Sequence, residues 1–188
     1  MMLFDTTMAI VSAQRILLVG EAGAGKSTTG NFLLGRDAFE VGGGLEAVTS
    51  SVECVGDELV VCDSPGFGDS NPSILVDVHG LVYVHNAKQI RMTRGSRRAL
   101  RVLGHIDPRR VLFVFTRSTG SRAFLAAFHE AVCKRGFCGN TTVAFAGTKN
   151  VVLSFLAKRR MRKQVATWLA QLPEDTIFVN TTHEKRCS

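Results

Sequence analysis

The sequence of 188 residues predicts one α/β domain with a doubly wound, mostly parallel sheet of about six strands. Two observations lead to this prediction. Apolar runs of strand length alternate with segments of helical periodicity, which is typical of parallel sheets covered by helices on both faces. Two of the runs are joined by a Gly-Asp pair, which predicts a hairpin and therefore one antiparallel pair at the sheet edge.

The elements follow in order from the positions of these runs. The apolar run RILLVG predicts a first strand, and helical spacing begins directly after the glycine-rich loop that follows it. The segment 63–73 (DSPGFGDSNPS) predicts a loop because of its Gly, Pro, Asn and Ser content. We expect strands over 15–20, 51–55, 58–63, 81–85, 111–116 and 141–147, and helices over 26–34, 94–103, 121–134 and 153–172. The domain is expected to cover 15–172, between an N-terminal extension (1–14) and a C-terminal tail (173–188).

The composition is that of an ordinary soluble globular protein, with 45% hydrophobic and 21% charged residues. No stretch approaches the ~20 continuous apolar residues of a membrane span, so no transmembrane anchor is expected. The five cysteines are odd in number, and Cys54 and Cys62 fall in strand-like runs where a thiol behaves as a small hydrophobe. We therefore expect reduced cysteines and a cytoplasmic location.

Residues 20–29 read GEAGAGKSTT and match the phosphate-binding pattern G-x-x-x-x-G-K-[ST], between a predicted strand and a predicted helix. Such a loop turns backbone N–H groups toward phosphate oxygens, and the helix N-terminus adds its positive dipole end. Lys26 would reach the β- and γ-phosphates, and the Ser27 hydroxyl would ligate Mg²⁺. The residues expected to contact the nucleotide here are Glu21, Ala22, Gly23, Ala24, Gly25, Lys26 and Ser27.

A phosphate-binding loop needs a carboxylate to complete the magnesium shell, and Asp63 is the candidate. It ends a predicted strand, so it would face the Ser27 side of the phosphates at the carboxyl edge of the sheet. The backbone N–H of Gly66 would then sense a γ-phosphate, although Pro65-Gly66 would equally suit a simple turn. Thr49, between the first helix and the hairpin, is expected to ligate Mg²⁺ while the γ-phosphate is present.

Four stretches of the sequence together resemble the immunity-associated GTPases, the GIMAP and plant avirulence-induced (AIG) group, which is related to septins and chloroplast import GTPases. They are GEAGAGKSTTGNFLLGRDAFE (20–40), VTSSV (48–52), VVCDSPGFGD (60–69) and FVFTR (113–117). The family's GKSxTGNxxLG helix is matched by residues 25–35. The resemblance implies a Ras-like G domain that binds GTP and GDP with Mg²⁺, and it implies hydrolysis in members that dimerise through the nucleotide face.

The resemblance also implies roles for single residues. Thr28 would contact the α-phosphate, Thr49 would belong to the first switch, and Asp63 with Gly66 would belong to the second. Arg91 is the nearest match to the family's arginine-containing box, from which an arginine can reach the transition-state charge across a dimer. A solvated basic residue is the alternative interpretation of Arg91.

The segment that would read the base departs from the family's T-R-x-D pattern. It reads Thr116-Arg117-Ser118-Thr119 and lacks the carboxylate that accepts both N–H bonds of guanine. Either guanine selectivity is relaxed, or Arg117 and other loops hold the base differently. The last base contacts are expected at Gly147 and Thr148.

Phe67 stands where many small GTPases carry a water-positioning Gln, so we expect slow intrinsic hydrolysis that a homodimer would stimulate. The alternative is a nucleotide-gated scaffold with little or no hydrolysis and relaxed base specificity. A small-molecule P-loop kinase is disfavoured by the predicted hairpin and the D-x-P-G sequence.

The net charge of +7 is concentrated in a few segments. Four arginines share one face of the predicted helix over 94–103, at positions 94, 97, 98 and 101. They form either a solvated outer face or a contact surface for an acidic protein or an anionic membrane. Nucleic acid is disfavoured because aromatic residues make up only 7% of the chain.

Overall fold

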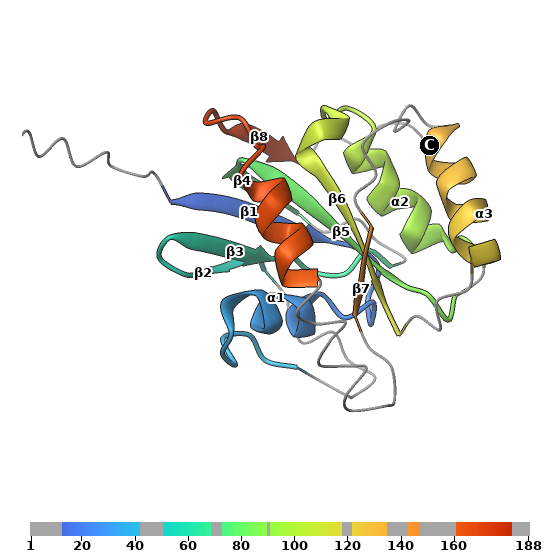
Figure 1. The fold of residues 1–188 in the computed structure, drawn as a ribbon, viewed down its shortest axis with the longest axis horizontal. Helices are drawn as coiled ribbons and strands as arrows, with labels where there is room; N and C mark the ends of the chain where they lie inside the picture. Colours follow the sequence, from blue (N-terminus) through green and yellow to red (C-terminus); the bar gives the residue numbers. More distant parts are fainter. Residues whose placement is uncertain are drawn as a thin grey trace, which may run out of the picture.

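The computed structural model describes residues 13–41, 51–68, 73–89, 91–117, 122–134, 143–146 and 161–181, and all structural statements concern these residues. A twisted sheet crosses the molecule between two layers of helices (Figure 1). The phosphate-binding loop follows the first strand of the chain. The strands next to that strand therefore determine which residues lie beside the loop.

The central sheet contains six of the described strands in the order β2-β3-β1-β5-β6-β7. Their bounds are Glu53–Val55 (β2), Leu59–Asp63 (β3), Gln14–Val19 (β1), Gly80–Asn86 (β5), Val111–Thr116 (β6) and Val143–Ala146 (β7). All neighbouring pairs are parallel except β2 with β3, which is antiparallel at the edge. The predicted mostly parallel sheet with one antiparallel edge hairpin is therefore confirmed.

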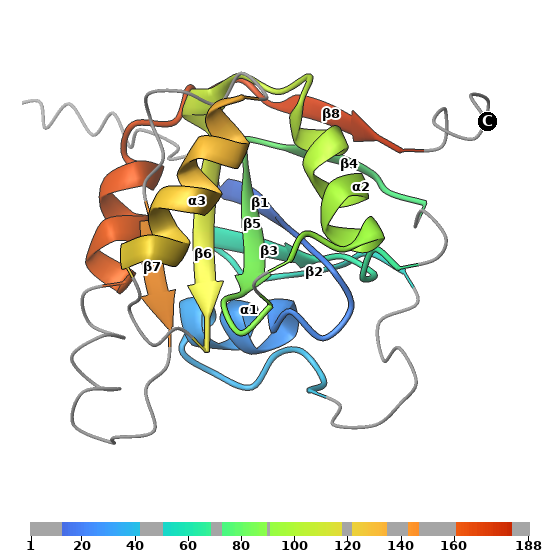
Figure 2. The same ribbon diagram turned by 90° about the vertical axis from the view of Figure 1, so that its right-hand side faces the viewer.

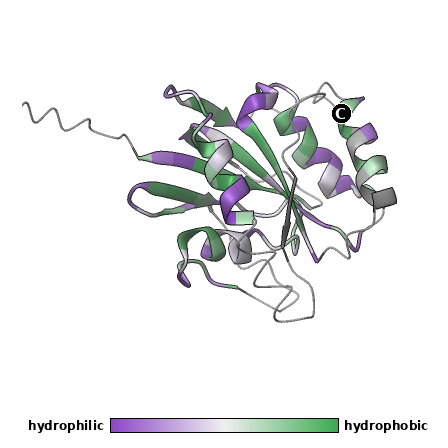
Figure 3. Cartoon of the chain, in the orientation of Figure 1, coloured by the Kyte–Doolittle hydropathy of each residue, from purple (hydrophilic) through white to green (hydrophobic). Residues whose placement is uncertain are grey.

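Helices cover both faces of this sheet. α1 (Lys26–Leu34) and a helix over 161–169 lie on one face, and α2 (Arg94–Leu103) and α3 (Arg122–Cys133) lie on the other (Figure 2). Side chains of a strand alternate between the two faces, so each central strand supplies both cores. Accordingly, the central strands are largely hydrophobic in Figure 3. The predicted doubly wound arrangement is confirmed.

The segment that follows α1 is held against the helix by one buried side chain, Asn31. Its Nδ2 donates to the Phe39 carbonyl at 2.8 Å, and its Oδ1 accepts from the backbone N–H groups of Ala38 at 2.9 Å and Phe39 at 2.7 Å. A Cβ at Gly30 would lie 2.7 Å from the Phe39 ring. Gly30 thus leaves room for the Phe39 ring, and Asn31 holds the Phe39 backbone, so that Phe39 packs in the core on this face of the sheet.

Two short strands were not predicted. β4 (Leu75–Val78) and β8 (Ile177–Asn180) pair in antiparallel fashion and form a separate two-stranded sheet. Val78 and Val179 face the core, whereas the Phe178 side chain is exposed. β8 lies in the segment expected to be a tail, and the boundary of the domain at residue 172 stays a prediction.

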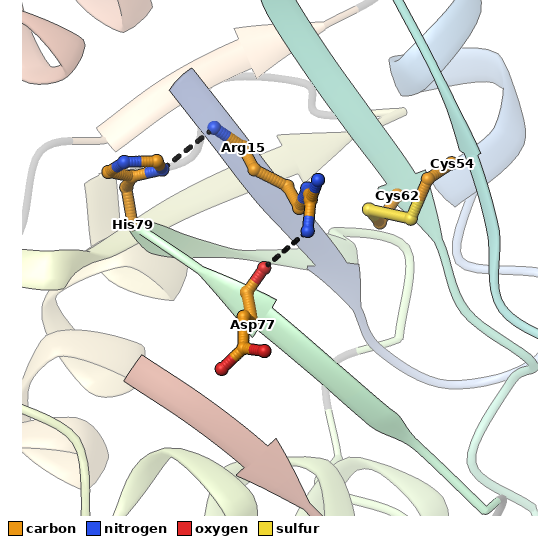
Figure 4. The surroundings of a disulfide bond; sticks show 5 residues. All are labelled: Arg15, Cys54, Cys62, Asp77 and His79. Carbon is orange, nitrogen blue, oxygen red and sulfur yellow. Dashed lines mark hydrogen bonds between the residues drawn. A yellow bond between two sulfur atoms is a disulfide. The ribbon is translucent and has the colours of Figure 1, made fainter. Parts of the chain in front are cut away.

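The cysteines of the edge hairpin differ from the expectation. Cys54 and Cys62 lie directly opposite each other in the β2–β3 register and form a disulfide (Figure 4). Figure 4 also shows Arg15 beside this bond, its guanidinium donating to the backbone oxygen of Asp77. The expectation that this pair is reduced was wrong, because directly opposed positions of a hairpin place both side chains on one face within reach.

None of the helices that the structure describes is long and apolar enough to cross a membrane.

Candidate functional site

The loop between β1 and α1 has the backbone that phosphate binding requires. Gly23 (φ 72°) and Gly25 (φ 96°) adopt left-handed conformations, which only glycine adopts without strain. Gly25 precedes α1, and no side chain caps the helix there. The first N–H groups of the helix are therefore left for an anion.

Lys26 lies folded over this loop. The side chain is buried, and its Nζ donates to the Glu21 carbonyl at 3.2 Å. Burial lowers the pKa of Lys26, and the nearby carboxylates of Asp63 and Glu21 partly oppose this effect. The ammonium group is thus held at the loop by a neutral oxygen that a phosphate oxygen could replace.

The two residues expected to ligate magnesium are in contact. The Ser27 Oγ donates to the Asp63 Oδ2 at 2.6 Å, and Asp63 is only 1% exposed. Asp63 ends β3, which runs parallel to β1 with Leu18 opposite Asp63, so both loops leave the same edge of the sheet. Hydroxyl and carboxylate oxygens are the ligands that Mg²⁺ prefers, and this pair fits the ion.

The segment after Asp63 packs directly on the phosphate-binding loop. The Phe67 N–H donates to the Gly20 carbonyl at 3.0 Å, and the Ala22 N–H donates to the Phe67 carbonyl at 3.2 Å. A Cβ at Gly66 would lie 2.4 Å from the Ala22 Cα, so only glycine permits this approach. The Phe67 side chain is fully buried.

The end of β6 also reaches the loop. The Thr116 Oγ1 donates to the Ala24 carbonyl at 2.6 Å and lies 3.3 Å from the His85 carbonyl. Arg117 follows with a φ of 52°, unusual for a residue other than glycine, and its side chain is exposed. The structure therefore brings Thr116, the first residue of the expected base-reading segment, against the phosphate-binding loop.

None of the contacts described above involves Arg91. Arg91 is exposed in the segment between β5 and α2. Four predicted residues lie outside the described part of the chain, namely Thr49, Thr119, Gly147 and Thr148.

The first turn of α2 joins the site, although the sequence analysis did not assign it there. The Ser96 Oγ donates to the Glu21 Oε2 at 3.1 Å, and the Arg98 NH1 donates to the Gly68 carbonyl at 2.6 Å. Thr93 caps this helix by accepting from the Ser96 N–H at 3.0 Å. The T-x-x-S spacing of this cap was visible in the sequence, but nothing local points to Glu21, 75 residues earlier.

The sheet and this loop define a P-loop domain with a Ras-like G fold. Residues 14–82 of this chain match the model of the AIG1 family. This match confirms the resemblance found in the sequence for that part of the chain.

Individual relatives agree with this assignment. The immune-associated nucleotide-binding protein 12 of Arabidopsis thaliana is 42% identical over 67 residues, which cover 32% of this chain and 17% of the relative. The chain thus spans much less than two thirds of that relative's length.

Solved structures show the same fold at low sequence identity. Toc33 from Arabidopsis thaliana in complex with GDP and Mg²⁺ aligns with a TM-score of 0.58 and 15% identity, over 89% of this chain and 88% of that chain. A structure of the chloroplast translocon components atToc33 and psToc159 aligns with a TM-score of 0.65 and 14% identity, over 90% and 86% of the two chains.

Proposed function

We propose that this protein binds GTP and GDP with Mg²⁺ and acts as a nucleotide switch with slow GTP hydrolysis that dimerisation stimulates. One observation carries the proposal: the 2.6 Å contact between Ser27 and Asp63 beside the buried Lys26. The Toc33 structures with GDP or GMPPNP and Mg²⁺ support it, because they hold these ligands on the same fold.

The phosphates would lie against the backbone N–H groups of residues 22–27. In this proposal Lys26 transfers its hydrogen bond from the Glu21 carbonyl to the β- and γ-phosphates, and Thr28 contacts the α-phosphate. Ser27 and Asp63 hold Mg²⁺, and Thr49 joins them in the triphosphate state. The ion, when bound, neutralises charge on the phosphate oxygens.

The switch itself would involve Gly66. Its N–H would bond to the γ-phosphate, and the segment that carries it is already bonded to Gly20 and Ala22 through Phe67. Loss of the γ-phosphate would remove this bond and change the position of the segment.

Hydrolysis would need help from a second molecule. The Phe67 side chain is apolar and fully buried, so it cannot orient a water molecule. Arg91 is exposed and would be offered to the nucleotide of a partner copy. Dimerization is described as important for the GTPase activity of atToc33 and psToc159, which supports this arrangement.

Base recognition would use Thr116, Arg117, Thr119, Gly147 and Thr148. The Thr116 hydroxyl donates to the Ala24 carbonyl, so its part in base recognition would be to hold the phosphate-binding loop beside this segment. Position 119 holds no carboxylate, and the titration with GDP, ADP and XDP measures how strongly guanine is preferred.

The first experiment is a titration of the purified protein with fluorescent GDP, ADP and XDP, with and without Mg²⁺. Lys26→Ala should abolish binding, whereas the matched change Lys163→Ala, at an exposed position on the helix over 161–169, should not. Binding of GDP with exclusion of ADP supports a guanine-specific switch. Comparable binding of all three contradicts guanine specificity, and no binding by a folded protein overturns the proposal.

The second experiment measures GTP turnover per molecule as the protein concentration rises. A rate that grows with concentration and falls in Arg91→Ala supports stimulation by a dimer. A constant, negligible rate with intact binding favours the nucleotide-gated scaffold.

A further inference from the structure

One face of α2 is an uninterrupted row of arginines. Arg94, Arg97 and Arg101 are exposed, and Arg98 is half-buried. The opposite face of the helix packs on the core, and hydrophilic and hydrophobic residues alternate along the helix in Figure 3. The face predicted from the sequence is therefore present on the surface. We call these four residues the arginine face.

No carboxylate in the described part of the chain forms an ion pair with the arginine face. By contrast, the next two arginines along the chain are both paired, Arg109 with Asp107 and Arg110 with Asp175. Like charges at helical spacing repel one another, so the arginine face favours a ligand that brings negative charge.

The same helix contacts both the phosphate-binding loop and the segment that follows Asp63. Ser96 donates to the carboxylate of Glu21 in the phosphate-binding loop, and Arg98 donates to the carbonyl of Gly68, two residues after Gly66. A Cβ at Gly95 would lie 2.5 Å from the Phe67 carbonyl oxygen, so the start of α2 packs directly against the segment that contains Phe67. A ligand that moves α2 would therefore act on these contacts.

We propose that the arginine face is a docking surface for an acidic segment of a partner protein, and that docking is coupled to the bound nucleotide. The coupling rests on the proposed function, whereas the docking does not. α2 spans ~15 Å, which ~5 residues of an extended acidic segment would cover. Guanidinium groups bind carboxylates in bidentate pairs, and this chemistry suits Asp and Glu side chains.

The surroundings favour an acidic protein over a membrane. The large exposed apolar side chains among the described residues are Val41, Leu75 and Phe178, and none belongs to α2. A helix that lies on a membrane needs such side chains beside its basic residues.

The docking test measures binding of a fluorescent poly-glutamate peptide by anisotropy at low and at physiological salt. We expect Arg97→Ala/Arg101→Ala to weaken binding by about tenfold or more, whereas Arg36→Ala/Lys163→Ala, which removes the same charge from exposed sites elsewhere, should stay within about twofold. Equal losses in both variants, or no binding by the wild type, overturn the docking surface. Binding to phosphatidylserine vesicles but not to the peptide also overturns it.

The coupling test compares peptide affinity in the GDP state and in the GMPPNP state. We expect a difference of about fivefold or more, and the same factor in nucleotide affinity when peptide is added, because linkage is reciprocal. Ser96→Ala should keep peptide binding and reduce this difference. Equal peptide affinity in both states of the wild type overturns the coupling, whereas failure of the GDP titration itself overturns the proposed function.

Discussion

The Ser27 hydroxyl donates to the Asp63 carboxylate at 2.6 Å although 36 residues separate them in the chain. The contact exists because β1 and β3 are adjacent and parallel, so the loops that follow them leave the sheet at one edge. A hydroxyl–carboxylate hydrogen bond of this kind is short and charge-assisted, and a bound divalent cation would replace it with ligation by the oxygens of both residues.

Removing either partner should therefore abolish the contribution of magnesium. We expect Ser27→Ala to weaken GDP binding in Mg²⁺ by about 10- to 100-fold and to leave little difference between Mg²⁺ and EDTA. The titration with fluorescent GDP measures this effect, with Ser73→Ala, an exposed serine, as the control. A Ser27→Ala protein that still gained affinity from Mg²⁺ would contradict the assignment.

Gly66 should tolerate no side chain. A Cβ there would meet the Ala22 Cα at 2.4 Å, whereas a Cβ at Gly68 would meet nothing within 4 Å. We expect Gly66→Ala to cost about 1–3 kcal/mol of unfolding free energy and to reduce the preference for GMPPNP over GDP. Gly68→Ala is the matched control, and equal unfolding midpoints for the two variants in urea would refute the close approach.

Asn31→Ala should destabilise the protein by about 2 kcal/mol. The change removes three hydrogen bonds and leaves two backbone N–H groups and the carbonyl of Phe39 without their partner in a buried place. Thermal unfolding measures the loss, and Gln171→Ala, at an exposed position, should leave the midpoint nearly unchanged. An unchanged midpoint in Asn31→Ala would show that the loop does not depend on this side chain.

Reduction of the Cys54–Cys62 disulfide should lower the unfolding free energy by about 2.5 kcal/mol, the chain-entropy value for a loop closed over so few residues. Urea unfolding with and without dithiothreitol measures the difference. The Cys54→Ser variant should show the reduced stability under both conditions. Sensitivity of that variant to dithiothreitol would point to another pair of cysteines.

Asp175 should stabilise the protein in a pH-dependent manner. Its carboxylate lies 2.6 Å from the guanidinium of buried Arg110, and hydrogen bonding to that group lowers the pKa of Asp175 below its ordinary 3.8. Because the folded pKa is lower than the unfolded one, the contribution is complete above the unfolded value and is lost as the pH falls through the folded value.

The expected result is a lower unfolding temperature for Asp175→Asn than for the wild type near neutral pH, with the gap closing as the pH falls through the lowered pKa of Asp175. Asp77→Asn, an exposed carboxylate on β4, is the control. A gap that persisted at the lowest pH would assign the effect to packing rather than to charge.

Much of this fold follows from local patterns. The helices at 26–34 and 94–103 and the strand at 111–116 have the predicted bounds, because each carries an unbroken apolar run or helical spacing. The meeting of Ser27 with Asp63 was also predictable, since it needs only two neighbouring parallel strands.

The remainder depends on contacts between distant segments. β4 and β8 are four residues each, too short for a clear period, and each is a strand only because the other pairs with it. The disulfide depends on the register of the hairpin, and the Ser96–Glu21 bond depends on how α2 sits on the phosphate-binding loop. No local sequence pattern contains these relationships.

The pairing of β8 with β4 also decides how the protein should be handled at the bench. A purification tag joined directly after Leu172 would replace β8, the strand that pairs with β4 and places Ile177 opposite Val78. A tag joined beyond Thr181 would keep both strands, together with the Thr181 bond to Ile74. Attachment to a biosensor chip should therefore use the second position.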